Sequence, residues 1–426
     1  MPRSLPQWIE YIQTLHPRSI DLSLDRVAKV WDRFKPDALP PLIAIAGTNG
    51  KGSSVSMLES IYRHAGYRTA AFTSPHLVRF NERICLDNVP VDDDRLLVSF
   101  ERVESVRGDV PLTFFEFNTL LALDIFCNAT PDVILLEVGL GGRLDAVNVV
   151  ENDLALITAI DVDHTAWLGN SREQIGAEKA GIIKAGGLAV LADPDVPQSA
   201  VDIANTIGAS FVRSGVDYTL KPGPQRKFTF ISEHPKLQAF DGFEFAPALR
   251  HVHNNRGGVV AVVAMLYDRL PVNQAQLRIG LSKQKLSGRL QLIPGEPLIL
   301  LDVSHNEASV LSMLEYIDTL DTQGRVHAIF GALADKDYGS AYEALKSRID
   351  HWYLCDLEGE RGQSAEMLRE KLFVHPSLQE NHANVALYVS AERAFSEAKL
   401  QAEDEDLLLI FGSFYLVGAI MPILTN

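Results

Sequence analysis

Apolar and polar residues follow two patterns that alternate along the chain. Short, nearly continuous apolar runs predict buried parallel strands, whereas apolar residues three or four positions apart predict helices. The strands predicted in the first half are Leu42–Ala46, Thr69–Thr73, Asp132–Val138 and Leu154–Ile160. The predicted helices are two within residues 4–35 and others from Ser54 onward, Asp92–Val106, Thr113–Cys127 and Ser171 onward. This alternation predicts an α/β fold with a mainly parallel sheet that helices cover on both faces.

The alternation starts afresh after a basic, turn-rich stretch at Ser282–Arg289. Leu298–Val303 opens this second series, and the short runs of Leu188–Phe245 are expected to complete the first sheet. A chain of 426 residues also exceeds the size at which one core usually keeps growing. We therefore expect two domains. Residues 1–290 are expected to form a doubly wound sheet domain, and residues 291–426 a smaller Rossmann-like α/β domain.

Composition and charge narrow the class of protein. The chain is 46% hydrophobic and 22% charged, which is typical of globular proteins with large cores. The net charge is −16 and no lysine- or arginine-rich run occurs, so the sequence disfavours a nucleic-acid partner. Three scattered cysteines and an N-terminus without an apolar signal region predict a reducing, cytoplasmic setting.

The last twenty residues raise the alternative of a membrane anchor, because Leu407–Asn426 carries no charge. Gly412, Gly418 and Pro422 interrupt the apolar run. We therefore expect a strand, a turn and a buried helix at this end of the chain, and no membrane partner.

The loop after the first strand carries candidate chemistry. Its residues are Gly47, Thr48, Asn49, Gly50, Lys51, Gly52 and Ser53. Glycines let backbone N–H groups converge on an anion, Lys51 suits terminal phosphates, and the Ser53 hydroxyl suits Mg²⁺. The stretch departs from the general G-x-x-x-x-G-K-[ST] pattern, because Ile45 replaces the first glycine and Gly52 follows Lys51. A nucleotide-triphosphate site is expected, which would make residues 1–290 a P-loop ATPase-type domain. An ordinary strand-to-helix turn is the alternative.

Polar residues at two other strand ends could join this loop. Glu137 ends an apolar strand near the expected switch point of the sheet, and it is either a Mg²⁺ ligand or a solvated strand-end acid. Asp163 and His164 follow the next strand, and Lys179 lies in the helix after it. In the second domain, Asp302 and His305 follow the first strand. The carboxyl ends of parallel strands meet at one edge, so each group is expected at a ligand-binding edge.

Taken together, the motifs resemble the folylpolyglutamate synthase/dihydrofolate synthase family, within the Mur-ligase superfamily of ATP-dependent amide ligases. The resemblance runs in order through both halves of the chain. It is carried by AGTNGKGS, TSPHLVRFNERI, FFEFNTLLAL, LLEVGLGGRLDAVN, DVDHTAWLGNSREQIGAEKAGIIK, SGR, LDVSHN and GALADKD. It implies a Mur ligase central-like ATP-binding domain followed by a Mur ligase C-terminal-like domain.

The resemblance implies roles for individual residues. The Lys51 loop would hold ATP, Ser53 and Glu137 would share one Mg²⁺, and His164 and Lys179 would serve a second one. Lys179 is similar to a lysine that becomes a carbamate in that family. Asn255 is similar to a residue that contacts adenine, and Arg289 is similar to one that contacts phosphate. Asp302 and His305 are similar to residues that close on nucleotide and substrate. The resemblance also marks candidate substrate residues, which are Thr73, Ser74, Pro75, His76 and Arg83.

The implied reaction is ATP-dependent addition of L-glutamate to dihydropteroate or to folate (poly)glutamates, through an acyl phosphate, by a monomeric enzyme. One departure from the family pattern lies in the second domain, where Val303–Glu307 reads VSHNE instead of Gly-Ala-His-Asn-Pro. The alternatives are another Mur-type amino-acid ligase, a P-loop phosphotransferase or ATPase, and a catalytically silent nucleotide-binding regulator.

Overall fold

The computed structural model describes residues 3–284, 286–320, 322, 324–334, 336, 344–345, 347–359, 361–373 and 384–425. Packing divides the chain into two compact units, residues 1–74 with 80–285 and residues 75–79 with 286–426. The short segment 75–79 therefore packs with the second unit, although residues of the first unit flank it in sequence. The sequence placed its domain boundary at 290/291, and the division by packing falls at 285/286.

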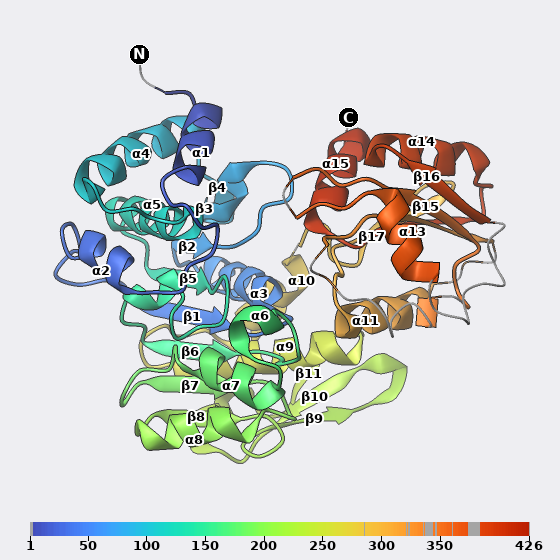
Figure 1. Cartoon of the computed structure of the whole chain (residues 1–426). Coiled ribbons are helices and arrows are strands. Elements are labelled where there is room, and N and C mark those ends of the chain that lie inside the picture. Colours follow the sequence, from blue (N-terminus) through green and yellow to red (C-terminus); the bar gives the residue numbers. More distant parts are fainter. Residues whose placement is uncertain are drawn as a thin grey trace. The chain divides into compact units, whose positions relative to one another are not determined.

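An eight-stranded sheet forms the centre of the first unit, in the order β4-β3-β2-β5-β1-β6-β7-β8 (Figure 1). Its strands are β1 (Leu42–Ala46), β2 (Thr69–Phe72), β3 (Ile84–Leu86), β4 (Val89–Pro90), β5 (Val133–Glu137), β6 (Leu154–Ile157), β7 (Leu188–Leu191) and β8 (Ser210–Arg213). The six strands from β2 to β8 in this order are parallel, and β3 and β4 form an antiparallel hairpin at the edge. The predicted α/β class and mainly parallel sheet are confirmed.

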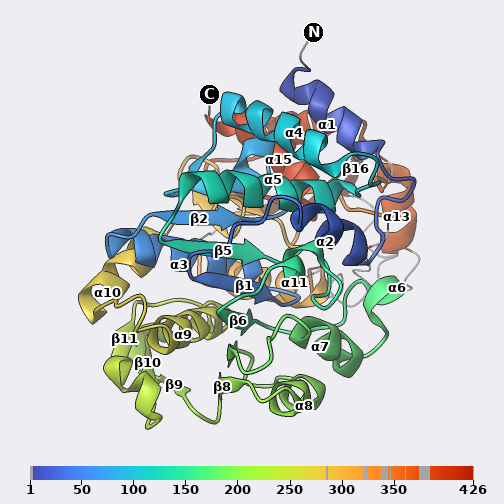
Figure 2. The same ribbon diagram turned by 90° about the vertical axis from the view of Figure 1, so that its left-hand side faces the viewer.

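Helices cover both faces of this sheet, as the apolar pattern of β1 requires. Leu42, Ala44 and Ala46 join one core, and Ile43 and Ile45 join the other. The first core is completed by α1 (Leu5–Gln13), α2 (Asp25–Trp31), α4 (Asp93–Arg107), α5 (Phe114–Ala129), α7 (Arg172–Ala180) and α8 (Gln198–Thr206). The second is completed by α3 (Lys51–His64), α9 (Arg250–Met265) and α10 (Gln274–Lys283), with α10 packed along α3 (Figure 2).

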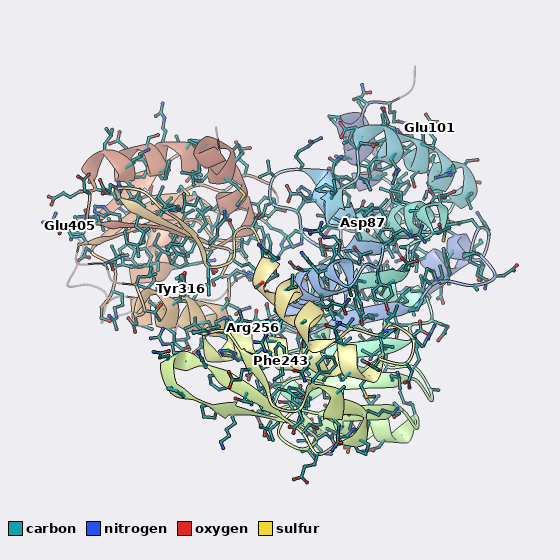
Figure 3. The ribbon with its side chains drawn as sticks, turned by 180° about the vertical axis from the view of Figure 1, so that it is seen from behind. Asp87, Glu101, Phe243, Arg256, Tyr316 and Glu405 are labelled. Atoms are coloured by element: carbon teal, nitrogen blue, oxygen red, sulfur yellow. The ribbon has the colours of Figure 1, made fainter. Side chains whose placement is uncertain are left out.

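The prediction that Leu188–Phe245 completes the main sheet is only partly right. β7 and β8 do so, but β9 (Thr219–Pro222), β10 (Phe228–Ile231) and β11 (Phe243–Phe245) form a separate antiparallel sheet. Phe243 and Phe245 are buried in the core that contains α9, whereas Glu244 between them is exposed. The small sheet buries its apolar face against α9 and not by pairing with the parallel sheet. Figure 3 labels Phe243 of this sheet and Arg256 of α9.

Two element boundaries near the candidate loop differ from the prediction. Helix α3 begins at Lys51 instead of Ser54, because Gly50 adopts a left-handed conformation (φ +92°) and its carbonyl accepts from the N–H of Ser54. Strand β6 ends at Ile157, not Ile160, and just beyond it the Thr158 hydroxyl donates to the carbonyl of Asn49 at 2.8 Å. Lys51 and Ser53 therefore lie in the first turn of a helix.

The second unit is built on a six-stranded sheet in the order β12-β13-β17-β14-β15-β16. Its strands are β12 (Gln291–Ile293), β13 (Leu298–Asp302), β14 (Val326–Phe330), β15 (His351–Cys355), β16 (Val385–Tyr388) and β17 (Leu407–Phe411). All are parallel except β12. Its flanking helices include α11 (Glu307–Ile317), α13 (Ala365–Phe373), α14 (Ala391–Gln401) and α15 (Phe414–Thr425). The GALADKD acids Asp335 and Asp337 lie outside the described residues.

The apolar end of the chain has the structure that its pattern predicts. Leu407–Phe411 is the buried central strand β17, and α15 follows after Gly412 and Ser413. Among the helices that the structure describes, none combines the length and the apolar character that crossing a membrane requires.

Candidate active site

The candidate phosphate loop lies between β1 and α3, where the chain leaves the centre of the main sheet. The N–H of Thr48 donates to the carbonyl of Ala159 at 2.7 Å, and the Thr48 hydroxyl donates to the carbonyl of Asp161 at 3.0 Å. The loop is thus attached to the segment after β6. Its last residues open a fourteen-residue helix, whose N-terminal N–H groups and dipole favour an anion.

Two glycines of the loop are required by close neighbours. A Cβ on Gly47 would lie 1.8 Å from the hydroxyl oxygen of Thr158. A Cβ on Gly50 would lie 2.4 Å from Oδ1 of Asn255, in addition to the strain of its positive φ. The second clash shows that the Asn255 side chain of α9 packs directly against the loop, so the structure brings these predicted residues together.

Lys51 and Lys179 meet at one carbonyl oxygen. The Nζ atoms of Lys51 and Lys179 donate to the carbonyl of Gly47 at 2.9 and 3.0 Å, and Lys51 also donates to that of Thr48 at 3.3 Å. Lys179 is only 5% exposed. Burial, together with the charge of Lys51, lowers the pKa of Lys179 to about 7, against the opposing effects of Asp163 and Asp145.

Glu137 ends β5, directly beside the end of β1. It pairs in register with Ile45 and its side chain is buried. Its Oε2 accepts from the N–H of Ser74 at 3.0 Å, while the N–H of Thr73 donates to the carbonyl of Arg83 at 2.9 Å. The buried position excludes the alternative of a fully solvated acid, and the contact with Ser74 places one candidate substrate residue at the carboxylate.

Asp145 is a residue that the sequence analysis did not single out. Its carboxylate accepts from the N–H groups of Leu140 and Val147 at 2.8 and 3.0 Å, and it therefore holds the turn after Glu137. Burial raises the pKa of Asp145 to about 6, although these hydrogen bonds and the charge of Lys51 act against the rise. Its signal in the sequence was the acid in GLGGRLDA, a glycine-rich turn after a buried strand.

His164 lies in the segment after β6 and opens the short helix α6 (Thr165–Leu168). Its backbone is left-handed (φ +53°), an uncommon conformation for a residue with a side chain. Its N–H donates to Oδ1 of Asp163 at 2.7 Å, and its ring nitrogen Nε2 lies 3.9 Å from Oδ2 of that residue. The carboxylate therefore contacts both the backbone and the ring of His164.

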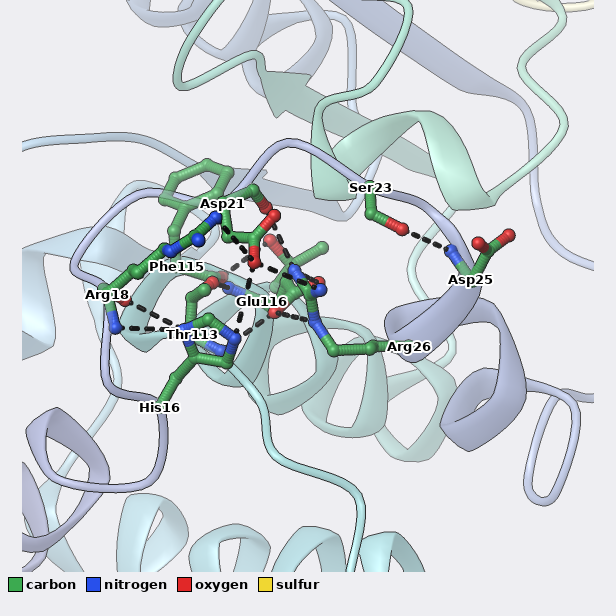
Figure 4. Close-up of polar contacts among 10 residues, drawn as sticks. His16, Arg18, Asp21, Ser23, Asp25, Arg26, Thr113, Phe115 and Glu116 are labelled. Atoms are coloured by element: carbon green, nitrogen blue, oxygen red, sulfur yellow. Dashed lines mark hydrogen bonds and ion pairs between the residues drawn. The ribbon is translucent and has the colours of Figure 1, made fainter.

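A charged cluster holds the start of α5 (Figure 4). Arg26 contacts both oxygens of the buried Glu116, at 3.2 and 3.3 Å, and also Asp21, at 3.4 Å. Glu116 in turn accepts from the N–H of Thr113 at 2.7 Å in a capping box. The cluster positions Phe115, whose ring packs so closely on Gly139 that a Cβ at Gly139 would clash with it.

The remaining candidate substrate residues fall into different surroundings. Arg83 is buried, and its guanidinium lies 5.4 Å from the ring centre of Phe114 and 5.9 Å from that of Phe80. Pro75 and His76 belong to the segment that packs with the second unit. The five residues therefore do not form a single group within the first unit.

The second unit has a cluster of its own around Asp302 at the end of β13. Asp302 accepts from the N–H groups of Leu290 and Ser304 at 2.7 and 2.8 Å and from the Ser304 hydroxyl. Burial raises the pKa of Asp302. Arg289 lies over Phe414, 5.5 Å from the ring centre, and the His305 ring lies 6.1 Å from the same ring. Asp302 thus holds the turn that carries Arg289.

The first unit offers donors that suit Mg²⁺ bound through phosphate. Among the residues that the structure describes, no three His, Cys, Asp or Glu side chains form a metal-binding group. Mg²⁺ does not need one, because it is usually bound by one or two carboxylates, waters and substrate phosphates. The buried Glu137 and the Ser53 hydroxyl beside a phosphate loop fit that requirement.

Comparison with known proteins points to one family. Residues 288–414 match the model of the Mur ligase, glutamate ligase domain. The dihydrofolate synthase/folylpolyglutamate synthase of Escherichia coli (strain K12) is 37% identical over 99% of this chain and 95% of that protein. Escherichia coli FolC in complex with DHPP and ADP superposes with a TM-score of 0.90, at 36% identity, over 99% of this chain and 98% of that one.

A second solved structure is a bifunctional folylpolyglutamate synthase/dihydrofolate synthase with Mn, AMPPNP and L-glutamate bound. It has a TM-score of 0.86 and 36% identity, and the match covers 100% of this chain and 98% of that one. These matches extend over both units and agree with the motifs of the sequence. The chain belongs to the folylpolyglutamate synthase/dihydrofolate synthase family.

Proposed function

We propose that the protein is an ATP-dependent ligase that joins the amine of L-glutamate to a carboxylate of dihydropteroate or of a folate (poly)glutamate. The observation that carries the proposal is the convergence of Lys51 and the buried Lys179 on the Gly47 carbonyl, in a phosphate loop beside Glu137. Its relatives support the substrates, because one is a structure with AMPPNP and L-glutamate and another is a complex with DHPP and ADP.

The chemistry explains why ATP is needed. A carboxylate is a poor acyl donor, because oxide is a poor leaving group. Transfer of the terminal phosphoryl group to the carboxylate gives an acyl phosphate, and attack by the glutamate amine then releases phosphate and forms the amide. Lys51 and the N–H groups at the start of α3 stabilise the charge on the transferring group. The products are the amide, ADP and phosphate.

Divalent cations have two proposed positions. Ser53 and Glu137 would hold one Mg²⁺, and His164 and Lys179 would hold a second. Bound Mg²⁺ neutralises phosphate charge and orients the nucleotide. Lys179 suits its role as a carbamate, because a buried amine with a pKa of about 7 is partly neutral at physiological pH and can add CO₂. Addition of CO₂ releases a proton and converts a cation into an oxygen ligand.

The other residues have supporting roles in the proposal. Gly47, Thr48, Asn49, Gly50 and Gly52 shape the phosphate loop, which Asn255 flanks on the adenine side. Arg289 contacts phosphate, and Asp302 positions the turn that carries it. His305 assists closure or proton transfer. Thr73, Ser74, Pro75, His76 and Arg83 contribute to the substrate side.

The setting and assembly are also proposals. We expect a cytoplasmic monomer, in keeping with cysteines 85, 127 and 355, which carry free thiols. Light scattering of the purified protein tests the monomer directly.

A substrate-omission assay tests the function. Phosphate release from ATP is measured with dihydropteroate or with tetrahydrofolate, each with and without L-glutamate. We expect release only when a pteroyl carboxylate and glutamate are both present, with one amide formed per phosphate. Release with neither acceptor identifies an ATPase, and phosphorylation without amide formation identifies a phosphotransferase.

A further inference from the structure

Helix α7 carries two cations that contact neighbouring loops. Arg172 is its first residue and Lys179 lies seven positions later. Seven residues are two helical turns, so both side chains leave the same side of the helix, about 10 Å apart along its axis. Lys179 reaches the Gly47 carbonyl of the phosphate loop, and Nε of Arg172 donates to the Ile160 carbonyl at 2.9 Å. One helix therefore fixes the phosphate loop and the segment that leads to His164.

The backbone of Ile160 is held on both sides. Its carbonyl accepts from Arg172, and its N–H donates to Oδ2 of Asp193 at 3.1 Å. Arg172 also donates to the carboxylate and to the backbone carbonyl of Asp195, each at 2.7 Å, and lies 3.6 Å from Asp193. Three nitrogens of one planar guanidinium make these contacts, which the single ammonium of lysine cannot reproduce.

The next residue is held by the phosphate loop. The Thr48 hydroxyl donates to the carbonyl of Asp161, and the N–H of Asp161 donates to the same hydroxyl, both at 3.0 Å. The segment that ends at His164 therefore starts from two peptide groups with fixed positions. Only three residues separate Ile160 from His164, so a shift at the start moves the ring.

We propose that Arg172, together with Asp193, is a positioning residue that sets where His164 is presented to a divalent cation. The proposal rests on the metal-dependent ligase activity proposed above. Arg172 acts on His164 through the Ile160 backbone. Replacement of a residue that orients a metal ligand typically lowers metal affinity by about 10- to 100-fold.

The test measures metal binding instead of turnover. The free Mn²⁺ signal in electron paramagnetic resonance is followed while protein with bound AMPPNP is titrated, for wild type, Arg172→Met, Arg172→Lys and Asp193→Asn. The affinity for fluorescent ADP without divalent cation and the melting temperature are recorded for each. Arg269→Met is the matched control. Arg269 pairs with Asp153, which precedes β6 and accepts from the N–H of Leu42, so this arginine also supports β6 but at its opposite end.

We expect Arg172→Met to weaken Mn²⁺ binding about tenfold or more, with ADP binding within about twofold of wild type. Arg172→Lys should be intermediate, and Asp193→Asn milder, because an amide oxygen can still accept from Ile160. Arg269→Met should leave Mn²⁺ affinity unchanged. Wild-type affinity in Arg172→Met, or equal weakening in Arg269→Met, overturns the proposal. A wild-type protein that binds no Mn²⁺ with AMPPNP overturns the proposed metal site itself, and with it the positioning role of Arg172.

Discussion

Lys51 and Lys179, from two different helices, donate to the same carbonyl oxygen, that of Gly47, at 2.9 and 3.0 Å. Burial of Lys179, and after it the charge of Lys51, brings the pKa of Lys179 to about 7. An anion at the loop would relieve the repulsion between the two ammonium groups. We therefore expect nucleotide binding and the protonation of Lys179 to be coupled through the charge of the bound anion.

Replacement of Lys51 is expected to impair the stabilisation of phosphate while the protein still folds. Lys51→Ala should reduce ATP-dependent amide formation by about 10²-fold or more, because a charge on the transferring phosphoryl group loses its partner. The pKa of Lys179 should rise in this variant, since the charge of Lys51 lowers it. Amide formation and the pH profile of lysine carbamylation with ¹³C-bicarbonate are the measurements. Exposed Lys29 provides the control variant Lys29→Ala, and near-normal turnover of Lys51→Ala would exclude the assigned role.

Replacement of Lys179 should be repaired by added carboxylate. Lys179→Ala removes the side chain that we propose becomes a carbamate, and activity should fall by at least about tenfold. Formate or acetate can supply the missing oxygen ligand, so either should restore part of the activity in proportion to its concentration. Steady-state assays at constant ionic strength measure the effect, with chloride as the control. Unimpaired activity without any added carboxylate would contradict the prediction.

Gly47 should tolerate no side chain. In Gly47→Ala the new Cβ would lie 1.8 Å from the Thr158 hydroxyl oxygen, so the loop must move away from the segment after β6. We expect the affinity for ADP to fall by roughly tenfold or more, which is about 1.4 kcal/mol. Isothermal titration calorimetry provides the measurement. Gly223→Ala is the control, because its Cβ would come no closer than 3.5 Å to its nearest neighbour; equal affinities in both variants would refute the steric argument.

Glu59 of α3 gives the protein a predictable dependence on pH. Its buried carboxylate accepts from the N–H of Asn88 at 2.8 Å, at the β3–β4 turn where Asp87 lies (Figure 3). Burial raises the pKa of Glu59 from 4.5 to about 7. The unfolded chain therefore loses this proton before the folded protein does, and the stability contributed by the protonated group is lost as pH rises from 4.5 through 7.

Glu59→Gln removes this titration and keeps an oxygen acceptor. The free energy of unfolding of Glu59→Gln minus that of wild type should rise by roughly 3 kcal/mol between pH 4 and pH 8. Urea denaturation at a series of pH values measures the difference. The variant Glu101→Gln, at an exposed position of α4 labelled in Figure 3, is the control. A difference that does not change with pH would show that Glu59 has an ordinary pKa in the folded protein.

Much of the fold and part of the candidate site could be predicted from the sequence alone. Apolar runs such as Leu42–Ala46 and helical spacing in the segments between them are local properties, so the α/β class and the element order could be predicted. The pattern of the candidate phosphate loop was also local, because glycines, Lys51 and Ser53 follow one another in the chain. The ends of elements were less predictable, since α3 starts at Lys51 through the conformation of Gly50.

Which of these residues meet depends on how the elements pack in three dimensions. A hydrophobic pattern shows which face of an element is buried but not which element lies across from it. The convergence of Lys179 on the Gly47 carbonyl depends on the strand order β5-β1-β6 and on how α7 packs. For the same reason the burial of Asp145, and the hold of Arg172 on Ile160, could not be inferred from spacing. These contacts join residues far apart in the chain, and only packing in three dimensions sets their distances.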